Sequence, residues 1–425
     1  MLGENRYIIN GPQILKGDVV ISGSKNAALP IIAATVLSKK EIELDNVPRL
    51  VDVKNLVEIL KNMGSYVEFQ GNKLVVCHDG IGNETDQYLS GKLRASVLLL
   101  GPTLARKGEA IVYLPGGCSI GTRPIDLHLK GLEKLGAHIK VEKGYVYAKA
   151  KKLVGADIVL DFPSVGATEN IMMAAALAEG VTTITGAAKE PEIEDLANFI
   201  NSIGGDVRGA GTNEIKIHGV KELNVPSQYR IMPDRIEAGT FMVAAAINHK
   251  NRVTLKSVCV KDLEQIMDKL EEMGVRFQVE GDSVKVIPPM RLKAVDITTM
   301  PHPGFPTDLQ AQMMTILAFA DGKSVIKETI FENRMNHAKE LQKIGVDVSI
   351  QQGVAIINGK KGLLGATHYV GASLESFDLR GGVSMVLAAL NSKGVSEVLN
   401  ICHIERGYEN LIGKFNNLGV EIEMQ

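Results

Sequence analysis

Cys118 is the residue with the clearest potential for covalent chemistry, because of the segment in which it stands. Gly116, Gly117 and Gly121 surround it, and Arg123 follows closely. Glycines let the backbone adopt conformations that other residues avoid, so a loop with an accessible thiol is expected here. A nearby arginine favours the thiolate, which is the reactive form of cysteine. The alternative is a surface loop with an incidental cysteine, and the segment alone does not decide between the two.

Several basic residues stand where they could bind an anion. Ser24, Lys25 and Asn26 open an apolar helix, so backbone amides at its start could help to hold a negative group. The alternative is a Ser or Asn cap beside a solvated lysine. Arg94 precedes another apolar helix, and Arg406 follows the loop of the last repeat. A single arginine is usually solvated, but arginine also binds phosphate or carboxylate through two contacts at once.

Asp308 is the candidate general base. Thr307 and Asp308 open a helix near Leu309, and capping is a common role for aspartate at such a position. A carboxylate can also accept a proton when it lies within hydrogen-bond reach of a hydroxyl group. Both roles remain open from these residues alone.

The other cysteines and the bulk composition limit the alternatives. Cys77, Cys259 and Cys402 lie on or beside strand-like runs, and we expect them to be buried small hydrophobic residues. No CxxC pair is present, which disfavours a zinc site or a disulfide framework. The net charge is −2, so no general basic field draws nucleic acid to the protein. The start has no apolar core of a signal peptide, and no apolar run approaches the ~20 residues of a membrane helix, so a cytoplasmic location is expected.

A sixfold repeat must position these residues. An amphipathic helix that ends in glycine and continues into a β-patterned run recurs about every 70 residues, and such repetition is more specific than any single cap. The glycines are Gly64, Gly136, Gly204, Gly274, Gly345 and Gly419. Six small-residue apolar helices, expected to be buried, alternate with them at residues 27–37, 95–105, 168–178, 238–247, 309–320 and 382–390.

The repeats predict an α/β protein with two domains, because 425 residues exceed one ordinary core. Hairpins are expected at residues 139–148 and 275–287. The last unit lacks its final strands, so we expect the N-terminal strands at 7–9 and 18–21 to complete it. Three repeats then form a domain at residues 25–229, and three form a discontinuous domain at residues 1–24 plus 230–425.

Five segments resemble a known family in their order and sequence. They are 22–30 (SGSKNAALP), 114–128 (LPGGCSIGTRPIDLH), 233–240 (PDRIEAGT), 305–312 (FPTDLQAQ) and 403–409 (HIERGYE). Together they closely resemble the UDP-N-acetylglucosamine 1-carboxyvinyltransferases, also called UDP-N-acetylglucosamine enolpyruvyl transferases, over essentially the whole chain. That family has a two-lobed inside-out α/β barrel, the enolpyruvyl transferase fold, with three repeats in each lobe. The repeat count agrees with this fold.

The resemblance implies a reaction. The enolpyruvyl group of phosphoenolpyruvate passes to the 3-hydroxyl of UDP-N-acetylglucosamine by addition and elimination, and phosphate is released. This is the first committed step of peptidoglycan biosynthesis, and it needs no metal and no cofactor. The partners are therefore small molecules, with neither nucleic acid nor membrane involved.

The resemblance also implies roles for individual residues. Cys118 would protonate the methylene carbon of phosphoenolpyruvate, form a pyruvate adduct and be the target of fosfomycin. Asp308 would accept the proton of the sugar hydroxyl, and Lys25 and Arg406 complete the catalytic set. Substrate contacts would come from Lys25, Asn26, Arg94, Arg123, Pro124, Ile125, Asp126, Leu127, Ser164, Val165, Gly166, Asp308, Ile330, Asp378 and Arg406.

One departure and three rivals qualify this interpretation. Many members carry a lysine just before the Ser-Val-Gly segment, where this chain has Pro163. The sister enzyme that acts on shikimate 3-phosphate lacks the Cys118 loop. An RNA 3′-phosphate cyclase shares a related repeat but would need RNA contacts and nucleotide attachment at a histidine, and the net charge of −2 and the absence of a basic stripe give it little support. His128 is expected to be a packing residue. An inactive paralogue that acts as a binding protein is disfavoured by the retention of Lys25, Cys118 and Asp308.

Overall fold

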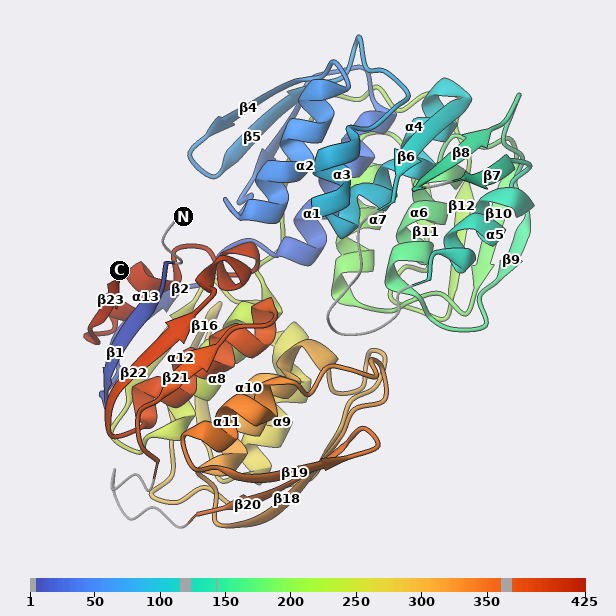
Figure 1. The fold of residues 1–425 in the computed structure, drawn as a ribbon. Coiled ribbons are helices and arrows are strands. Elements are labelled where there is room, and N and C mark those ends of the chain that lie inside the picture. Colours follow the sequence, from blue (N-terminus) through green and yellow to red (C-terminus); the bar gives the residue numbers. More distant parts are fainter. Residues whose placement is uncertain (1–4, 115–123, 143, 361–368) are drawn as a thin grey trace. The chain divides into compact units, whose positions relative to one another are not determined.

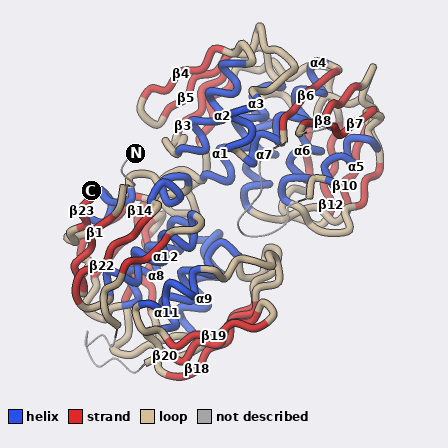
Figure 2. Tube along the Cα trace, viewed as in Figure 1, coloured by secondary structure: helices blue, strands red, loops and turns tan. Residues whose placement is uncertain are grey.

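The computed structural model describes residues 5–114, 124–142, 144–360 and 369–425 (Figure 1). Cys118 and Arg123 lie outside the described residues. The described chain is an α/β protein in which helices and short sheets alternate along the sequence, as Figure 2 shows. No helix within these ranges combines the length and the apolar character that a membrane crossing requires.

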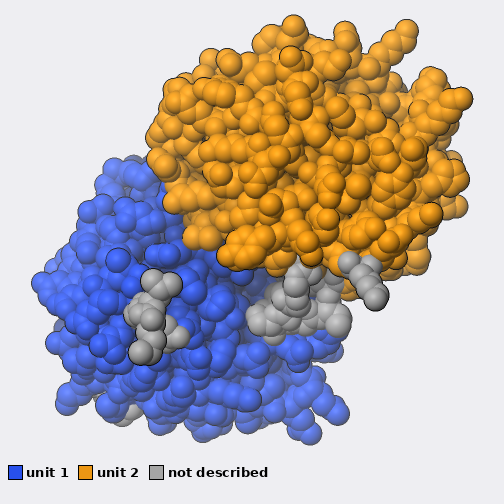
Figure 3. All heavy atoms as spheres, turned by 45° about the horizontal axis from the view of Figure 1, so that its top comes forward, with its two compact units in different colours: residues 1–22, 118–122, 233–425 blue, residues 23–117, 123–232 orange. Residues whose placement is uncertain are grey.

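The described residues divide into two compact units (Figure 3). One contains the described residues up to Ser22 and those from Pro233 to Gln425. The other contains the described residues between Gly23 and Met232. The domain limits drawn from the sequence, 25–229 and 1–24 with 230–425, stay a prediction.

One pairing pattern recurs in all the described sheets. The strand that follows a buried helix pairs antiparallel with the second strand of a hairpin, and the first hairpin strand lies on its far side. In the last sheet, β1 (Tyr7–Gly11) and β23 (Ile422–Met424) take the places of these two hairpin strands. A parallel strand usually adds an outer edge. The sixfold repeat and the α/β class predicted from the sequence are therefore confirmed.

The unit between Gly23 and Met232 contains three of these sheets. In spatial order they are β13 (Ser227–Arg230), β3 (Ile42–Asp45), β5 (Lys73–Cys77) and β4 (Tyr66–Gln70); β6 (Glu109–Tyr113), β8 (Tyr145–Lys149) and β7 (His138–Glu142); and β11 (Asp206–Arg208), β12 (Glu214–His218), β10 (Val181–Thr185) and β9 (Asp157–Val159). The hairpin expected at 139–148 is β7 and β8.

The other unit also contains three sheets. They are β15 (Arg276–Glu280), β16 (Ser283–Ile287), β14 (Arg252–Lys256) and β2 (Lys16–Val20); β17 (Ile297–Thr298), β18 (Gly322–Lys327), β20 (Val354–Gly359) and β19 (Asp347–Gln351); and β21 (Ser373–Glu375), β22 (Gly394–Leu399), β1 (Tyr7–Gly11) and β23 (Ile422–Met424). The second expected hairpin is β15 and β16.

The N-terminal strands separate between two sheets, which corrects part of the sequence prediction. Strand β1 lies between β22 and β23, so it completes the last repeat as expected. Strand β2, which covers most of the 18–21 run, instead pairs parallel with β14 in the fourth repeat. The sequence pattern of β2 shows which of its residues are apolar. It does not show which strand β2 pairs with, because pairing depends on tertiary contacts.

Apolar, small-residue helices fill the interior of each unit. Nearly all of their residues are buried, as the sequence predicts, because they are apolar on every face. They are α1 (Lys25–Ala34) with η1 (Thr35–Leu37), η2 (Arg94–Leu99) with α4 (Leu100–Lys107), α6 (Val165–Ala175), α8 (Arg235–Ile247), η4 (Thr307–Leu309) with α10 (Gln310–Ala318), and α12 (Leu379–Asn391). Helix α4 packs on α6, and α10 packs on α8 and α12.

Amphipathic helices pack against the buried helices, as α7 does on α1 and α5 on α6. In α2, Val53, Leu56 and Leu60 recur at helical spacing and are buried. This group comprises α2 (Val51–Asn62), α5 (Asp126–Lys134), α7 (Pro191–Ser202), α9 (Glu264–Glu272), α11 (His337–Lys343) and α13 (Leu411–Asn417), with α3 (Gln87–Lys92), η3 (Val260–Leu263) and η5 (Ile401–Arg406) as shorter additions. The six predicted cap glycines follow these six helices, all at positive φ between 80° and 107°, so the predicted left-handed caps are confirmed.

Candidate active site

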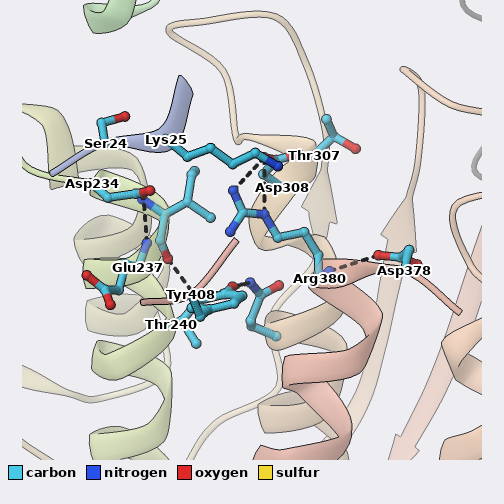
Figure 4. A network of polar contacts seen from close by, with 12 residues as sticks. Ser24, Lys25, Asp234, Glu237, Thr240, Thr307, Asp308, Asp378, Arg380 and Tyr408 are labelled. Carbon is cyan, nitrogen blue, oxygen red and sulfur yellow. Dashed lines mark hydrogen bonds and ion pairs between the residues drawn. The ribbon is translucent and has the colours of Figure 1, made fainter. Parts of the chain in front are cut away.

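Asp308 is held by two buried arginines. Nη2 of Arg334 donates to its Oδ1 at 2.6 Å, while Nε and Nη2 of Arg380 donate to Oδ2 at 3.2 and 3.1 Å. The arginine side chains are 6% and 3% exposed, whereas the Asp308 side chain is 26% exposed. These charge-assisted hydrogen bonds stabilise the ionised carboxylate. Asp308 therefore presents a partly exposed carboxylate with a fixed orientation (Figure 4).

The capping role considered for Asp308 is not found. The η4 helix begins at Thr307 after Pro306, and no side-chain hydrogen bond caps η4 or the following α10. The carboxylate is engaged by arginines that lie 26 and 72 residues further along the chain. Strong ion pairs at both oxygens take the place of the local hydrogen bond to the helix backbone.

Arg380 is positioned by a buried polar cluster. Its guanidinium lies over the Tyr408 ring, 5.3 Å from the centroid. The Tyr408 hydroxyl lies 3.0 Å from the hydroxyl of Thr240 and accepts a 3.1 Å hydrogen bond from Gln312. Burial raises the pKa of Tyr408, so it stays a neutral phenol near pH 7. Residues from α8, α10 and the segment after η5 thus fix the arginine that holds Asp308 (Figure 4).

Asp378 is the N-cap of α12. Its Oδ1 accepts hydrogen bonds from the backbone N–H groups of Arg380 at 2.8 Å and Gly381 at 2.9 Å. Burial lowers the pKa of His403, and the charge of Arg406 lowers it further while that of Asp378 opposes the shift. Both predicted residues therefore act on the same histidine. The structure brings Asp308, Asp378 and Arg406 into the unit that contains α10 and α12.

Ile330 lies in the turn that follows β18. Its backbone N–H donates to Oε1 of Glu328 at 2.8 Å, and the N–H of Phe331 donates to the same oxygen at 3.2 Å. The sequence interpretation missed Glu328, Arg334 and Arg380. A signal was present for Arg380, because it is the one charged residue in the apolar run of α12.

Lys25 is buried in the other unit. Ser24 caps α1 by accepting from the N–H of Ala27 at 3.3 Å, so the predicted cap is confirmed. The lysine is not solvated, however. Its Nζ lies 2.7 Å from Oδ2 of Asp52 in α2, and the two side chains are 9% and 5% exposed. A buried ammonium requires such a partner, and Asn26 follows it in the first turn of the same helix.

Arg94 and the Ser164–Gly166 segment meet at His128. Burial lowers the pKa of His128 to about 4, and the charge of Arg94 contributes to the shift. The His128 Nδ1 lies 3.0 Å from the amide nitrogen of Asn170 on α6. A Cβ on Gly166 would lie 2.9 Å from the His128 ring, so only glycine fits there without displacement. His128 is thus a neutral packing residue, as the sequence suggested, and it sets the spacing between α5 and α6.

The remaining predicted contacts surround the start of these helices. Ser164 caps α6 by accepting from the N–H of Ala167 at 3.4 Å, and Val165 is the first residue of that helix. Pro124 and Asp126 are exposed, while Ile125 and Leu127 are half-buried. The described part of this segment therefore offers both polar and apolar groups at the N-terminus of α5.

The prediction that three cysteines are buried is wrong. Cys259 and Cys402 are exposed, and Cys77 is half-buried. Cys77 ends β5 on the outward-facing side of the strand, Cys259 is the N-cap of the 3₁₀ helix η3, and Cys402 lies within the 3₁₀ helix η5. Across the described ranges, no group of three or more His, Cys, Asp or Glu side chains could hold a metal ion.

Sequence comparison covers the whole chain. The family model for EPSP synthase (3-phosphoshikimate 1-carboxyvinyltransferase) matches residues 9–415. UDP-N-acetylglucosamine 1-carboxyvinyltransferase 1 of Caldanaerobacter subterraneus subsp. tengcongensis is 48% identical over 419 residues, with 99% of both chains covered. UDP-N-acetylglucosamine 1-carboxyvinyltransferase 2 of Clostridium tetani is 49% identical over 421 residues, with 98% of this chain and 99% of the relative covered. The chain belongs to the UDP-N-acetylglucosamine 1-carboxyvinyltransferase family.

Solved structures agree on the fold. The enolpyruvyl transferase NikO of Streptomyces tendae superposes with a TM-score of 0.90 at 26% identity, covering 100% of this chain and 99% of its own. An EPSP synthase of Acinetobacter baumannii superposes with a TM-score of 0.76 at 21% identity, covering 99% and 100%. The chain thus has the enolpyruvyl transferase fold, as the resemblance predicted.

Proposed function

We propose that this protein transfers the enolpyruvyl group of phosphoenolpyruvate to the 3-hydroxyl of UDP-N-acetylglucosamine, with release of phosphate. The observation that carries the proposal is the near full-length identity of 47–49% to UDP-N-acetylglucosamine 1-carboxyvinyltransferases. The reaction would be the first committed step of peptidoglycan biosynthesis, carried out in the cytoplasm. The described side chains supply groups that suit anion binding and proton acceptance, while Cys118, the assigned proton donor, lies outside the described residues.

The anionic donor needs fixed positive charge. Lys25 is held by Asp52 and therefore carries its ammonium in a defined place. Arg94 lies in the same unit as Lys25, and Arg406 lies in the other. We assign Lys25, Arg94, Arg123 and Arg406 to the phosphate and carboxylate of phosphoenolpyruvate, because ammonium and guanidinium groups are the usual partners of these anions.

The acceptor hydroxyl needs a base. During addition, the 3-hydroxyl oxygen bonds to C2 of phosphoenolpyruvate, and the C3 methylene takes a proton from Cys118. Asp308 accepts the hydroxyl proton, and Arg334 and Arg380 hold its partly exposed carboxylate in a fixed orientation. During elimination, C3 loses a proton and phosphate departs, which restores the double bond. The charges of Arg334 and Arg380 are already fixed around Asp308, so these side chains need not reorient while charge develops on the reacting groups.

The nucleotide-sugar side is assigned to residues at helix starts and turns. Pro124, Ile125, Asp126 and Leu127 precede or begin α5, Ser164, Val165 and Gly166 begin α6, and Ile330 follows β18. Backbone N–H groups at helix N-termini favour anionic ligands such as a diphosphate. This contact would offset the absence of a lysine at Pro163.

Shikimate 3-phosphate is the second candidate acceptor, because the matching family model is described as EPSP synthase. Release of phosphate from phosphoenolpyruvate should be measured with each acceptor in parallel. Release with UDP-N-acetylglucosamine alone is the expected result. Release with shikimate 3-phosphate alone would replace the proposal, and binding of UDP-N-acetylglucosamine without release would favour an inactive binding protein.

A further inference from the structure

Glu328 is a buried carboxylate at the junction of two predicted functional segments. The residue is 8% exposed and directly follows β18. Its Oε1 accepts hydrogen bonds from Thr299 Oγ1 at 2.9 Å and from the N–H groups of Ile330 and Phe331 at 2.8 and 3.2 Å. Its Oε2 accepts from the hydroxyl of Thr307 at 2.8 Å. Both oxygens are thus used, and each is directed to a different segment.

The Oε1 side defines the turn that carries Ile330. Two successive backbone N–H groups converge on one oxygen, which closes the chain immediately after Glu328. Phe331 in this turn lies against Arg334, whose guanidinium carbon is 5.4 Å from the ring centroid. The position of the Ile330 backbone is therefore set by the Glu328 carboxylate rather than by a regular helix or strand.

The Oε2 side leads to Asp308. Because the Thr307 hydroxyl donates its proton to Glu328, its oxygen is free to accept from Nη1 of Arg334 at 3.0 Å. Nη2 of the same guanidinium donates to Oδ1 of Asp308 at 2.6 Å. A planar guanidinium that is fixed at one nitrogen is also oriented at the other. The rotation of Arg334, and with it one oxygen of Asp308, is thus tied to Glu328 through one hydroxyl group.

We propose that Glu328 is a positioning residue. It holds the Ile330 turn and, through Thr307 and Arg334, the Asp308 carboxylate in fixed positions relative to each other. The proposal rests on the proposed function, in which Ile330 contacts the nucleotide-sugar and Asp308 accepts its proton. One buried carboxylate would then support both the Ile330 contact with the acceptor substrate and the base that takes its proton. A base displaced by about 1 Å can lose a rate factor of about 100, so such a link has a measurable effect.

A pair of threonine variants separates positioning from general stability. Thr307→Val and Thr299→Val each remove one hydroxyl that bonds to Glu328, but only Thr307 also reaches Arg334. We expect Thr307→Val to lower kcat about 10- to 100-fold, with KM for UDP-N-acetylglucosamine changed less than about twofold. Thr299→Val should keep kcat within about twofold but raise KM for UDP-N-acetylglucosamine, because Thr299 Oγ1 supports the Ile330 turn through Oε1 of Glu328 and the N–H of Thr329. Thr307→Ser, which retains the hydroxyl, should restore kcat.

Glu328→Gln tests the carboxylate itself. Its amide would donate to Thr307, so the hydroxyl could no longer be oriented as it is by the carboxylate. We expect a lower kcat together with a higher KM for UDP-N-acetylglucosamine, because both branches are affected. Adding Thr307→Val to Glu328→Gln should lower kcat no further, since both changes interrupt one path. Thermal unfolding of each variant shows whether its fold is retained.

The outcomes distinguish this inference from the proposed function. An active wild-type enzyme with an unchanged kcat in Thr307→Val would overturn the inference alone. Equal losses of kcat in Thr299→Val and Thr307→Val would also overturn it, because they would indicate general loosening of the segment. A wild-type enzyme that releases no phosphate with UDP-N-acetylglucosamine would overturn the proposed function and the inference with it.

Discussion

Lys25 and Asp308, two of the predicted catalytic residues, each have an opposite charge as a fixed neighbour. Lys25 meets Asp52, and Asp308 meets Arg334 and Arg380. Removal of one partner from a buried pair leaves an uncompensated charge, which costs several kcal/mol, whereas the intact pair is roughly neutral in stability. These partners therefore serve to hold reactive groups in place. Neutralising Asp52 would disturb Lys25 even though Asp52 has no assigned contact with substrate.

The thiol chemistry predicted at Cys118 can be tested by fosfomycin labelling. We expect one fosfomycin adduct per chain, on the peptide that contains Cys118, and none in Cys118→Ser. The exposed Cys259 is an internal control, because partial burial and a hydrogen bond from its thiol to the Asp262 carboxylate raise the pKa of the thiol and so reduce the reactive thiolate. Mass spectrometry of the digested protein is the measurement.

Two further results would bear on Cys118. A carboxylic acid can also donate a proton but has no sulfur to alkylate, so Cys118→Asp is expected to keep turnover while it loses the adduct. Labelling at the exposed Cys402, persisting in Cys118→Ser, would show that the wrong thiol was assigned.

At the scale of elements, the features that were predictable are those that local chemistry determines. The cap glycines, the apolar helices and the two hairpins follow from periodicity and φ preferences within about ten residues of chain. The partners of Asp308 and the sheet joined by β2 did not follow, because they depend on residues far away in sequence. Thr307-Asp308 at a helix start fits a cap and an ion pair equally well, and only tertiary packing decides.

Asp378 has a structural role at the start of α12 that can be separated from a chemical one. Asparagine also accepts backbone hydrogen bonds at an N-cap, so Asp378→Asn should change the free energy of unfolding by less than about 0.5 kcal/mol, while Asp378→Ala should lose about 1 kcal/mol. Urea unfolding measures both. If the carboxylate charge also serves the reaction, Asp378→Asn will lower kcat at nearly unchanged stability. Equal stability of the Ala variant and wild type would contradict the capping role.

At the scale of the whole molecule, the repeat explains why strands from the two ends of the sequence pair in one sheet. The N–H of Arg6 donates to the carbonyl of Gln425 at 2.9 Å, and the N–H of Gln425 donates back at 3.0 Å. Strand β1 thereby takes the place that a hairpin strand holds in the other repeats. The missing strands at the C-terminus made this closure predictable. The roles of the site residues came from resemblance, since the periodicity places them but does not assign their chemistry.

Buried histidines in both units have lowered pKa values. His78 lies between the hydroxyls of Thr35 and Ser65, at 2.8 and 2.7 Å, and is fully buried. Burial, with a contribution from the charge of Arg106, lowers its pKa to about 3. Burial also lowers the pKa of His128 and of His337 to about 4. In the unfolded chain these side chains titrate near 6.5.

Acidification should therefore destabilise the fold at pH values well above the pKa values of ordinary carboxylates. Below pH 6.5 the unfolded state binds protons that the folded state excludes, so the free energy of unfolding falls as the pH decreases. One such histidine accounts for a loss of about 2 kcal/mol between pH 7 and pH 5. His78→Gln, which is neutral at both values, should show a correspondingly smaller difference in urea unfolding, whereas the exposed His138→Gln should match wild type. A pH dependence in His78→Gln equal to that of wild type would mean that His78 takes up its proton without unfolding.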